Sequence, residues 1–221
     1  MLKKIKGKLI VSCQALEDEP LHSSFIMGRM AKAAKEGGAI GIRAQGVSDI
    51  NEIKKVTGLP VIGIIKRNYE DSEIYITPTI KEIKELLETE CEMIALDATN
   101  RLRPNGENIK DLIDCIHNSN RLAMADISTF EEGVQAEKLG FDCISTTLSG
   151  YTPYSTQGEG VDFDLLEKLV KTVNIPVICE GKINTPEDLK KAFELGAYSA
   201  VVGGAITRPQ QITRRFTKVL K

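Results

Sequence analysis

Short, nearly continuous runs of hydrophobic residues recur along the chain, and segments with helical periodicity separate them. In one such segment, apolar residues recur three and four positions apart at Ile80, Ile83 and Leu87. Apolar runs of this length without polar alternation are typical of parallel strands that are buried on both faces. The predicted strands are Leu9–Ser12, Ala39–Ile42, Val61–Ile65, Met93–Leu96, Leu122–Ala125, Cys143–Ser145, Pro176–Cys179 and Ser199–Val202.

This alternation predicts a parallel eight-stranded (β/α)8 TIM barrel in the α/β class, formed by residues 1–221 as a single catalytic domain. Eight units in 221 residues give roughly 28 residues each, a normal size for a βα repeat. Ile74–Thr77 also has strand character. Because it would be a ninth strand, we assign it to a long loop after the third strand. An open doubly wound sheet is the alternative. It is disfavoured because no Gly-x-Gly-x-x-Gly follows the first strand and because eight strands favour closure.

Local signals at the helix ends agree with this pattern. Thr185 directly before Pro186 predicts the start of a helix, since threonine caps the first turn and proline suits its first position. Gly38, Gly140 and Gly196 each stand just before a predicted strand and predict helix ends.

Polar residues stand at most of the predicted strand ends. In barrel enzymes the chemistry is placed where the strands run into the βα loops, so these side chains are expected to converge on one mouth. One charge after a strand is usually only a solvated loop start, whereas a ring of polar residues indicates an active site. The strand-end residues are Gln14, Arg43, Lys66, Asp97, Asp126, Thr146, Glu180 and Gly203.

Lys66 and Glu180 are the candidate acid–base pair. They end the third and seventh strands, four apart in a ring of eight, and therefore approach the mouth from opposite sides. A substrate between them would meet an acid–base group on each face. Taken alone, Lys66 also fits a surface lysine, and Glu180 fits a partner in a structural ion pair.

The ends of the last two strands predict a phosphate site. Gly181 and Lys182 follow the seventh strand, and Gly203 and Gly204 end the eighth. Loops at this place in a barrel commonly bind phosphate through backbone N–H groups and a helix N-terminus. Glycine allows the backbone to approach the anion closely, and the guanidinium of Arg208 adds a fork for it. We therefore expect a small phosphorylated substrate.

The segment Thr146–Tyr154 is long and rich in small and hydroxyl residues, which fits either a lid that closes over the substrate or an ordinary mobile loop. Asp97 and Asp126 lack a third close ligand, and the two histidines have no metal-ligand spacing, so no metal site is expected.

Composition narrows the function classes further. The net charge is −2 and the basic residues are scattered, so a nucleic-acid partner is not expected. No stretch approaches the length of a membrane span, and acidic residues soon follow the basic N-terminus, so we predict neither a membrane protein nor a signal peptide. The five cysteines are widely spaced and odd in number, as in a cytoplasmic protein with reduced thiols. They are Cys13, Cys91, Cys115, Cys143 and Cys179.

Motifs at the strand ends, spread over almost the whole chain, carry a family resemblance. They are Val11–Ala15, Gly41–Ala44, Gly63–Arg67, Ala95–Thr99, Ala125–Ser128, Ser145–Tyr151, Glu180–Ile183 and Val202–Pro209. Together these motifs resemble the bacterial N-acetylmannosamine-6-phosphate 2-epimerases, and the combination is specific although no single piece is. The resemblance implies a barrel of the ribulose-phosphate-binding type. One departure is Lys182, where arginine is common in the family, which replaces a forked donor with a point charge.

The resemblance implies a cofactor-independent isomerase that converts N-acetylmannosamine 6-phosphate to N-acetylglucosamine 6-phosphate in sialic-acid and amino-sugar catabolism. Lys66 matches the catalytic acid–base residue and Glu180 its companion. Gln14, Arg43 and Asp126 match positions expected to hold the sugar. A homodimer is also implied.

The chemistry needs neither a redox cofactor nor a metal, provided that protein groups stabilise the enolate. In the ring-opened sugar, C2 lies next to the C1 aldehyde, so its proton is acidic, and removal and return on the other face inverts C2. A lysine base must be neutral part of the time, which requires a pKa lowered by desolvation or by a neighbouring cation. Arg43 and Arg67 are candidate neighbours of Lys66. Whether one residue handles both proton steps stays open.

Two other functions fit the same residues. A class I aldolase would form a Schiff base between Lys66 and a phosphorylated ketose or keto acid. A non-catalytic phosphosugar sensor would use the barrel only for binding, and would not need both Lys66 and Glu180.

Overall fold

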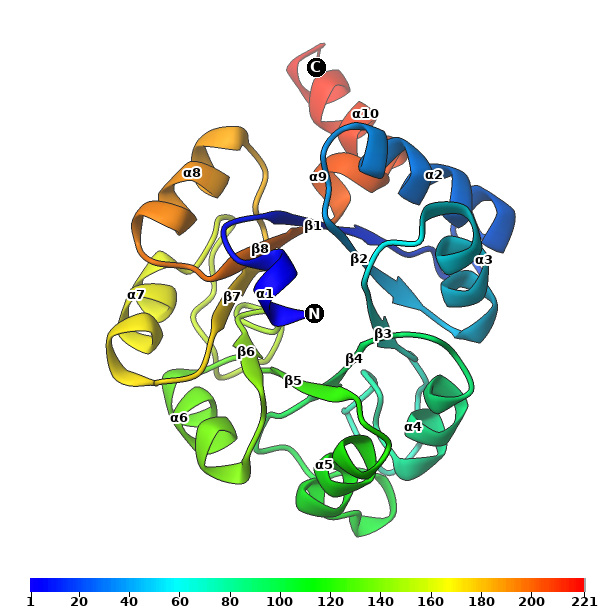
Figure 1. Cartoon of the computed structure of the whole chain (residues 1–221). Coiled ribbons are helices and arrows are strands. Elements are labelled where there is room, and N and C mark those ends of the chain that lie inside the picture. The colour runs from blue at the N-terminus through cyan, green and yellow to red at the C-terminus, as the bar shows by residue number, and fades with distance from the viewer. Residues whose placement is uncertain (221) are drawn as a thin grey trace.

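The chain forms a closed barrel of eight parallel strands in sequence order, with helices around it (Figure 1). We describe a computed structural model, which covers residues 1–220. The strands are β1 (Leu9–Cys13), β2 (Gly41–Gln45), β3 (Val61–Ile64), β4 (Met93–Asp97), β5 (Leu122–Asp126), β6 (Cys143–Ser145), β7 (Val177–Glu180) and β8 (Ser199–Val202). The predicted (β/α)8 barrel and its eight strands are confirmed, with the largest difference at β2, which begins and ends later than predicted.

Helices surround the barrel, and most of them follow a strand and cover the outside of the sheet (Figure 1). They are α1 (Leu2–Ile5), α2 (Ser24–Glu36), α3 (Val47–Thr57), α4 (Ile80–Leu87), α5 (Ile109–Asn118), α6 (Phe130–Leu139), α7 (Phe163–Thr172), α8 (Pro186–Glu194), α9 (Gly204–Thr207) and α10 (Pro209–Thr217), with short 3-10 turns η1 (Pro104–Gly106) and η2 (Lys218–Leu220). No helix within residues 1–220 combines the length and the apolar character that crossing a membrane requires.

Hydrophobic side chains fill both faces of the sheet, as the continuous apolar runs predict. One cluster fills the barrel interior and includes Ile10, Ile62, Met93 and Ile178. A second, larger cluster lies between the strands and the surrounding helices. Because both faces are covered, polar side chains on the strands can reach solvent only at the barrel ends.

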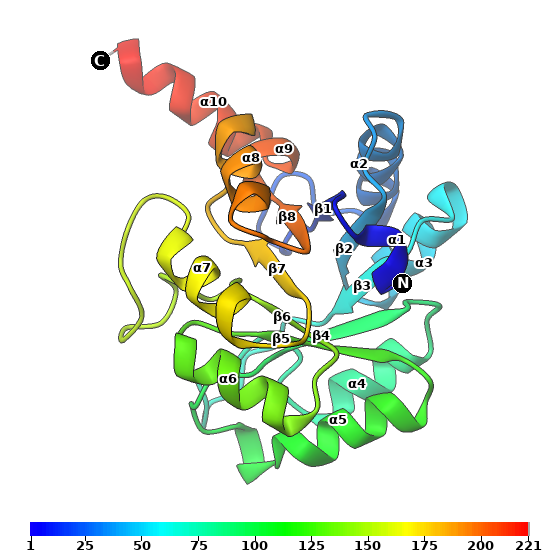
Figure 2. The same ribbon diagram turned by 60° about the vertical axis from the view of Figure 1, so that its left-hand side comes forward.

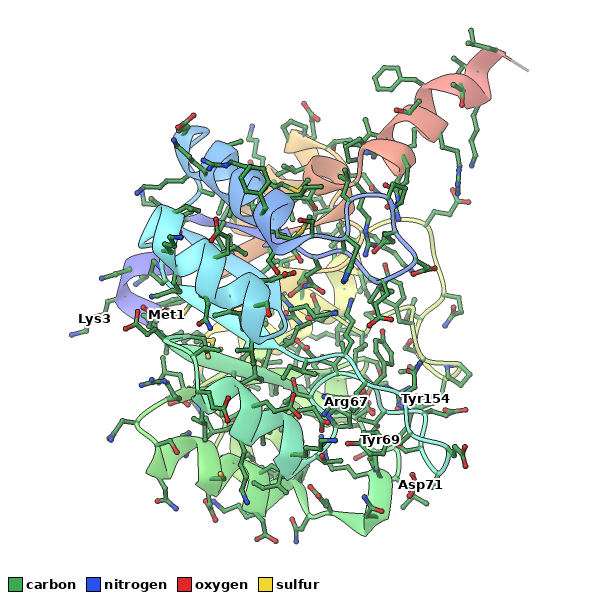
Figure 3. The ribbon with its side chains drawn as sticks, turned by 90° about the vertical axis from the view of Figure 1, so that its right-hand side faces the viewer. Met1, Lys3, Arg67, Tyr69, Asp71 and Tyr154 are labelled. Atoms are coloured by element: carbon green, nitrogen blue, oxygen red, sulfur yellow. The ribbon has the colours of Figure 1, made fainter. Side chains whose placement is uncertain are left out.

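One barrel end is closed by α1, and the other carries the long βα loops. Ile5 of α1 is fully buried and joins the interior cluster. Figure 3 shows Met1 and Lys3 at this closed end, whereas Tyr69, Asp71 and Tyr154 lie at the opposite end. The carboxyl ends of the strands therefore form the open mouth, which fixes the place of any site built from them.

Capping boxes begin three of the outer helices. Thr79, Thr129 and Thr185 each form a capping box at the start of α4, α6 and α8. The predicted helix start at Thr185 is confirmed, with Pro186 at the first helical position. Gly140 ends α6 with a φ of 93°, a left-handed conformation that favours glycine.

The segment from Ile74 to Thr77 is a loop, as predicted. Ile76 forms a single antiparallel bridge with Lys66 and belongs to no barrel strand. This bridge fixes the backbone directly after β3, where Lys66 leaves the barrel.

The last long helix, α10, departs from the regular pattern. It projects away from the barrel, as Figure 2 shows, and contains no buried residue. Phe216 on α10 is 74% exposed, and Val219 and Leu220 just beyond it are 82% exposed.

Candidate active site

A cavity of about 660 Å³ opens at the carboxyl ends of the strands. This volume lies within the range typical of small-molecule sites. All of the predicted site residues line it except Asp126, namely Gln14, Arg43, Lys66, Glu180, Gly181, Lys182, Gly203, Gly204 and Arg208. The structure thus brings together residues from five separate parts of the chain, at β1, β2, β3, β7 and β8, at the predicted mouth.

Lys66 enters the cavity directly after β3. Its backbone pairs with Ile76, and its amine forms no hydrogen bond or ion pair with another residue of the described chain. Burial lowers the pKa of Lys66 to about 8, and the positive charges of Arg43 and Arg208 act in the same direction. With this pKa a minor fraction of the lysine is neutral near pH 7, and that fraction is a competent base.

Arg67 does not have the role that the sequence suggests. Its guanidinium turns away from Lys66 and donates to the carboxylates of Glu82 and Glu85. Figure 3 shows Arg67 close to Tyr69, whose hydroxyl donates to the same Glu82 at 2.9 Å. The second cation that lowers the pKa of Lys66 is Arg208, far along the sequence, rather than the adjacent Arg67.

Arg43 lies across the barrel mouth and is almost fully buried, with 1% of its side chain exposed. It donates to Asp126 through two nitrogens, Nη2 to Oδ2 at 2.5 Å and Nη1 to Oδ1 at 3.0 Å. The same Nη1 donates to Glu180 Oε2 at 2.8 Å. Two carboxylates therefore compensate one buried guanidinium, which satisfies the requirement that a buried charge be paired.

Asp126 lies beneath the cavity rather than in its lining. It is fully buried, and both of its carboxylate oxygens accept from Arg43. Its direct effect is to fix the guanidinium that does line the cavity.

Glu180 presents one carboxyl oxygen to the cavity. Oε2 accepts from Arg43, while Oε1 has no hydrogen-bond partner in residues 1–220 and remains accessible. The side chain is 12% exposed. Burial raises the pKa of Glu180, and the nearby Asp126 carboxylate adds to this effect, while Arg43 opposes it. A carboxyl with a raised pKa and a free oxygen can exchange a proton with a bound ligand.

Gln14 brings an unpartnered acceptor to the cavity. Its Nε2 donates to Ser12 Oγ at 2.8 Å, whereas its Oε1 is buried and has no partner in the described chain. A buried amide oxygen without a partner is unfavourable, so a ligand N–H or O–H that donates to it would bind favourably.

The expected phosphate site consists of the two turns that follow β7 and β8. Gly203 caps the short helix α9, and Gly204 begins it. After β7, Gly181 and Lys182 have φ values of 103° and 57°, both in the left-handed region. This backbone places Lys182 on the cavity wall, where its amine donates to Gly158 O at 2.5 Å.

Arg208 lies at the cavity edge, but a carboxylate holds it. Its Nε and Nη2 each lie 3.1 Å from an oxygen of Glu19, in the loop after β1. In the described structure the guanidinium fork is therefore engaged by Glu19.

The loop after β6 also contributes to the cavity. Thr147, Leu148 and Tyr151 line it, and Lys182 Nζ lies 5.2 Å from the Tyr151 ring centroid. Tyr151 is 57% exposed. These contacts join the loop to the turn after β7. They are compatible with both predictions for Thr146–Tyr154, a lid or an ordinary mobile loop.

Two of the strand-end residues lie outside the site. Asp97 is fully buried and bonds with Thr99 and Arg101. Thr146 bonds with the backbone of Glu180, donating to its carbonyl at 2.8 Å. Among residues 1–220, no group of three or more His, Cys, Asp or Glu side chains is arranged to hold a metal ion.

The cavity also contains residues that the sequence did not single out. Tyr75, Thr147 and Arg215 line it, from the loop after β3, the loop after β6 and α10. Thr147 lies inside the segment considered as a lid and inside the motif Ser145–Tyr151, but neither assigned it a role.

Comparison with known proteins agrees with this geometry. Residues 27–221 match a family model described as "Putative N-acetylmannosamine-6-phosphate epimerase". A relative named as such a 2-epimerase from Clostridium perfringens (strain ATCC 13124) is 80% identical over the full length of both chains. One from Clostridioides difficile (strain 630) is 71% identical, covering all of this chain and 99% of that protein.

Solved structures give the same result. The N-acetylmannosamine-6-phosphate 2-epimerase from Clostridium perfringens superposes with a TM-score of 0.99 at 79% identity, covering 99% of this chain and 96% of that one. A thiamine phosphate pyrophosphorylase from Pyrococcus furiosus has a TM-score of 0.64 at 18% identity, with coverage of 99% and 96%. The latter shares the fold alone.

Proposed function

Because the chain belongs to the N-acetylmannosamine-6-phosphate 2-epimerase family, we propose that this isomerase inverts C2 of N-acetylmannosamine 6-phosphate with Lys66 as its acid–base residue. The observation that carries the assignment is an unpartnered Lys66 with a pKa of about 8 at the mouth of a barrel. The product is N-acetylglucosamine 6-phosphate, which places the enzyme in sialic-acid and amino-sugar catabolism.

Lys66 removes the C2 proton from the ring-opened sugar. The C2–H bond breaks, its electron pair enters the enolate over C1 and C2, and the proton moves to the neutral amine. Return of a proton to the other face of the planar enolate inverts C2. The positive charges of Arg43 and of the protonated Lys66 stabilise the enolate oxygen as negative charge develops.

Glu180 and Gln14 have supporting roles. Glu180 Oε1, which is free in the structure, is the acid–base companion that serves the proton exchanges of ring opening. Gln14 Oε1, which lacks a partner, accepts a hydrogen bond from the sugar. Asp126 acts through Arg43, which it holds by two hydrogen bonds.

The phosphate group binds at the turns after β7 and β8. Gly181, Gly203 and Gly204 offer backbone N–H groups, and Lys182 and Arg208 add positive charge. Binding there requires Arg208 to exchange its contact with Glu19 for one with phosphate. A dianion competes well for a guanidinium because charge-assisted bonds to phosphate are strong.

The decisive test is an NMR assay of N-acetylmannosamine 6-phosphate in deuterated water. Epimerisation predicts deuterium at C2 of recovered sugar without cleavage, and Lys66→Ala is expected to abolish the exchange while retaining binding. Cleavage products, or an adduct on Lys66 trapped by borohydride, would instead support the aldolase. Binding without any C2 exchange in the wild type would support the sensor.

We further propose that the enzyme is a homodimer in which α10 contacts a second copy. The support is the exposed apolar strip of Phe216 on α10 and Val219 and Leu220 on the following turn η2, since neither element contains a buried residue. Phe216→Glu is expected to shift the protein to monomer in sedimentation velocity. A variant that remains dimeric would exclude this strip as the interface.

The unpaired state of all five cysteines fits the reducing cytoplasm, where we place the enzyme.

A further inference from the structure

Four polar atoms form a closed ring of contacts beneath the cavity. Arg43 Nη1 donates to Asp126 Oδ1 at 3.0 Å and to Glu180 Oε2 at 2.8 Å. Thr147 Oγ1 lies 2.7 Å from the same Asp126 oxygen and 3.0 Å from the same Glu180 oxygen. The guanidinium and the hydroxyl thus contact the same two carboxylate atoms from two sides.

The two carboxylates are not held equally by Arg43. Asp126 accepts through both of its oxygens, which fixes the plane of its carboxylate. Glu180 contacts Arg43 through one atom only. A glutamate side chain has three rotatable bonds, so one contact leaves its carboxyl free to rotate about the anchored oxygen. A second contact on Oε2 restricts that rotation, and Thr147 provides it.

We propose that Thr147 is a positioning residue of the epimerase site, whose hydroxyl fixes the Glu180 carboxyl so that Oε1 faces the substrate. This inference rests on the proposed function and adds a residue to which neither the family resemblance nor the strand-end pattern gives a role.

A hydroxyl is suited to this place because it can both donate and accept. Arg43 can only donate, and an ionised carboxylate can only accept. When Glu180 is ionised, the Thr147 hydrogen can be donated to it. When Glu180 takes up a proton on its free Oε1, Oε2 becomes the carbonyl oxygen of the carboxyl and can still accept from Thr147. The contact therefore survives the change of charge that an acid–base group undergoes.

Ser145 completes the surroundings of the hydroxyl. Its Oγ lies 2.8 Å from Thr147 Oγ1 and 3.4 Å from Glu180 Oε2. Thr147 is thus the better placed of the two hydroxyls to hold Glu180, since its contact is 0.4 Å shorter (3.0 against 3.4 Å).

The test compares Thr147→Val with Thr147→Ser in the full-length enzyme. Valine keeps the shape of threonine but removes the hydroxyl, and serine keeps the hydroxyl. We expect Thr147→Val to lower kcat by about 10- to 100-fold, the range for losing a hydrogen bond to a charged group, with KM within about twofold of the wild type. Thr147→Ser is expected to keep kcat within about threefold of the wild type. Thr152→Val is the matched control, because its hydroxyl, in the same loop, is buried and unpartnered in the described chain.

The pH profile adds a measurement that a purely structural role would not change. The hydroxyl of Thr147 acts to lower the pKa of Glu180 by stabilising its ionised form. Its removal should therefore move the limb of the kcat profile that reports Glu180 to higher pH in Thr147→Val, and leave it in place in Thr147→Ser and Thr152→Val.

Each outcome decides the proposal. Wild-type kcat in Thr147→Val, a loss that serine does not restore, or a rise in KM alone would overturn it. Circular dichroism checks folding, and Thr147→Ala replaces valine if that variant unfolds. Failure of the proposed function is recognised separately, because the wild type itself would then show no exchange at C2.

Discussion

Replacing Lys66 with methionine should make the protein inactive and more stable at the same time. Methionine retains an unbranched apolar chain of similar length but carries no charge. In the folded protein, burial and two neighbouring cations lower the lysine pKa from its usual 10.5 to about 8. A lowered lysine pKa means that the charged amine opposes folding wherever it is charged in the unfolded chain.

The size of the effect and its sign follow from linkage. At pH 7 the lysine is charged in both states, so the difference between 10.5 and 8 corresponds to about 3 kcal/mol. Between pH 8 and 10.5 the unfolded chain binds more protons than the folded one, so the free energy of unfolding of the wild type rises with pH. The advantage of Lys66→Met should therefore fall to about 1 kcal/mol at pH 10.

Urea unfolding at pH 7 and pH 10 measures both values, and the melting temperature at pH 7 should rise by about 6–12 °C. Lys55→Met is a matched control, because this side chain is 78% exposed and its replacement should change neither value. A Lys66→Met variant that is no more stable than the wild type at pH 7, or equally stabilised at both pH values, would refute the reasoning.

Three further predictions concern the same site. In the wild type, kcat/KM should rise with pH through about 8 as Lys66 loses its proton, and a profile that is flat from pH 6.5 to 9 would exclude this lysine as the base. Asp126→Asn should lower the free energy of unfolding by about 3–5 kcal/mol, because it removes a charge partner from the buried Arg43; urea unfolding that shows a loss below about 1 kcal/mol would contradict this pairing. Arg208→Ala should raise KM for the sugar phosphate more than it lowers kcat, and steady-state kinetics with an unchanged KM would remove Arg208 from the phosphate site.

The barrel could be predicted because parallel strands buried on both faces leave an unambiguous apolar signal. The same signal indicates which residues stand at the strand ends, and five of those eight residues line the cavity, whereas Asp97, Asp126 and Thr146 do not. It does not determine where each side chain points. Thr146 and Thr147 are adjacent, yet the first bonds with the backbone of Glu180 and the second lines the cavity.

Contacts between charged residues far apart in sequence were the least predictable. Arg67 is adjacent to Lys66 and was an obvious neighbour, but Glu82 and Glu85 draw its guanidinium away. Instead, the second cation that lowers the pKa of Lys66 is Arg208. Arg208 is so distant in sequence that the hydrophobic pattern gives no indication of this contact. Opposite charges pair according to which positions the closed barrel brings together, and this depends on the whole topology rather than on local pattern.

The ring beneath the cavity divides the chain into two unlike parts. The cation of the ring, Arg43, comes from the first four strands, and its two anions, Asp126 and Glu180, come from the last four. Burial of Arg43 without these two carboxylates, or of the carboxylates without Arg43, would leave charge uncompensated, which is unfavourable. Closure of the barrel is the step that brings the two charges together, so the halves attract each other through the residues that later carry out catalysis. The ion pairs of the active site thus also favour the association of the two halves of the barrel, and the site forms only when the barrel closes.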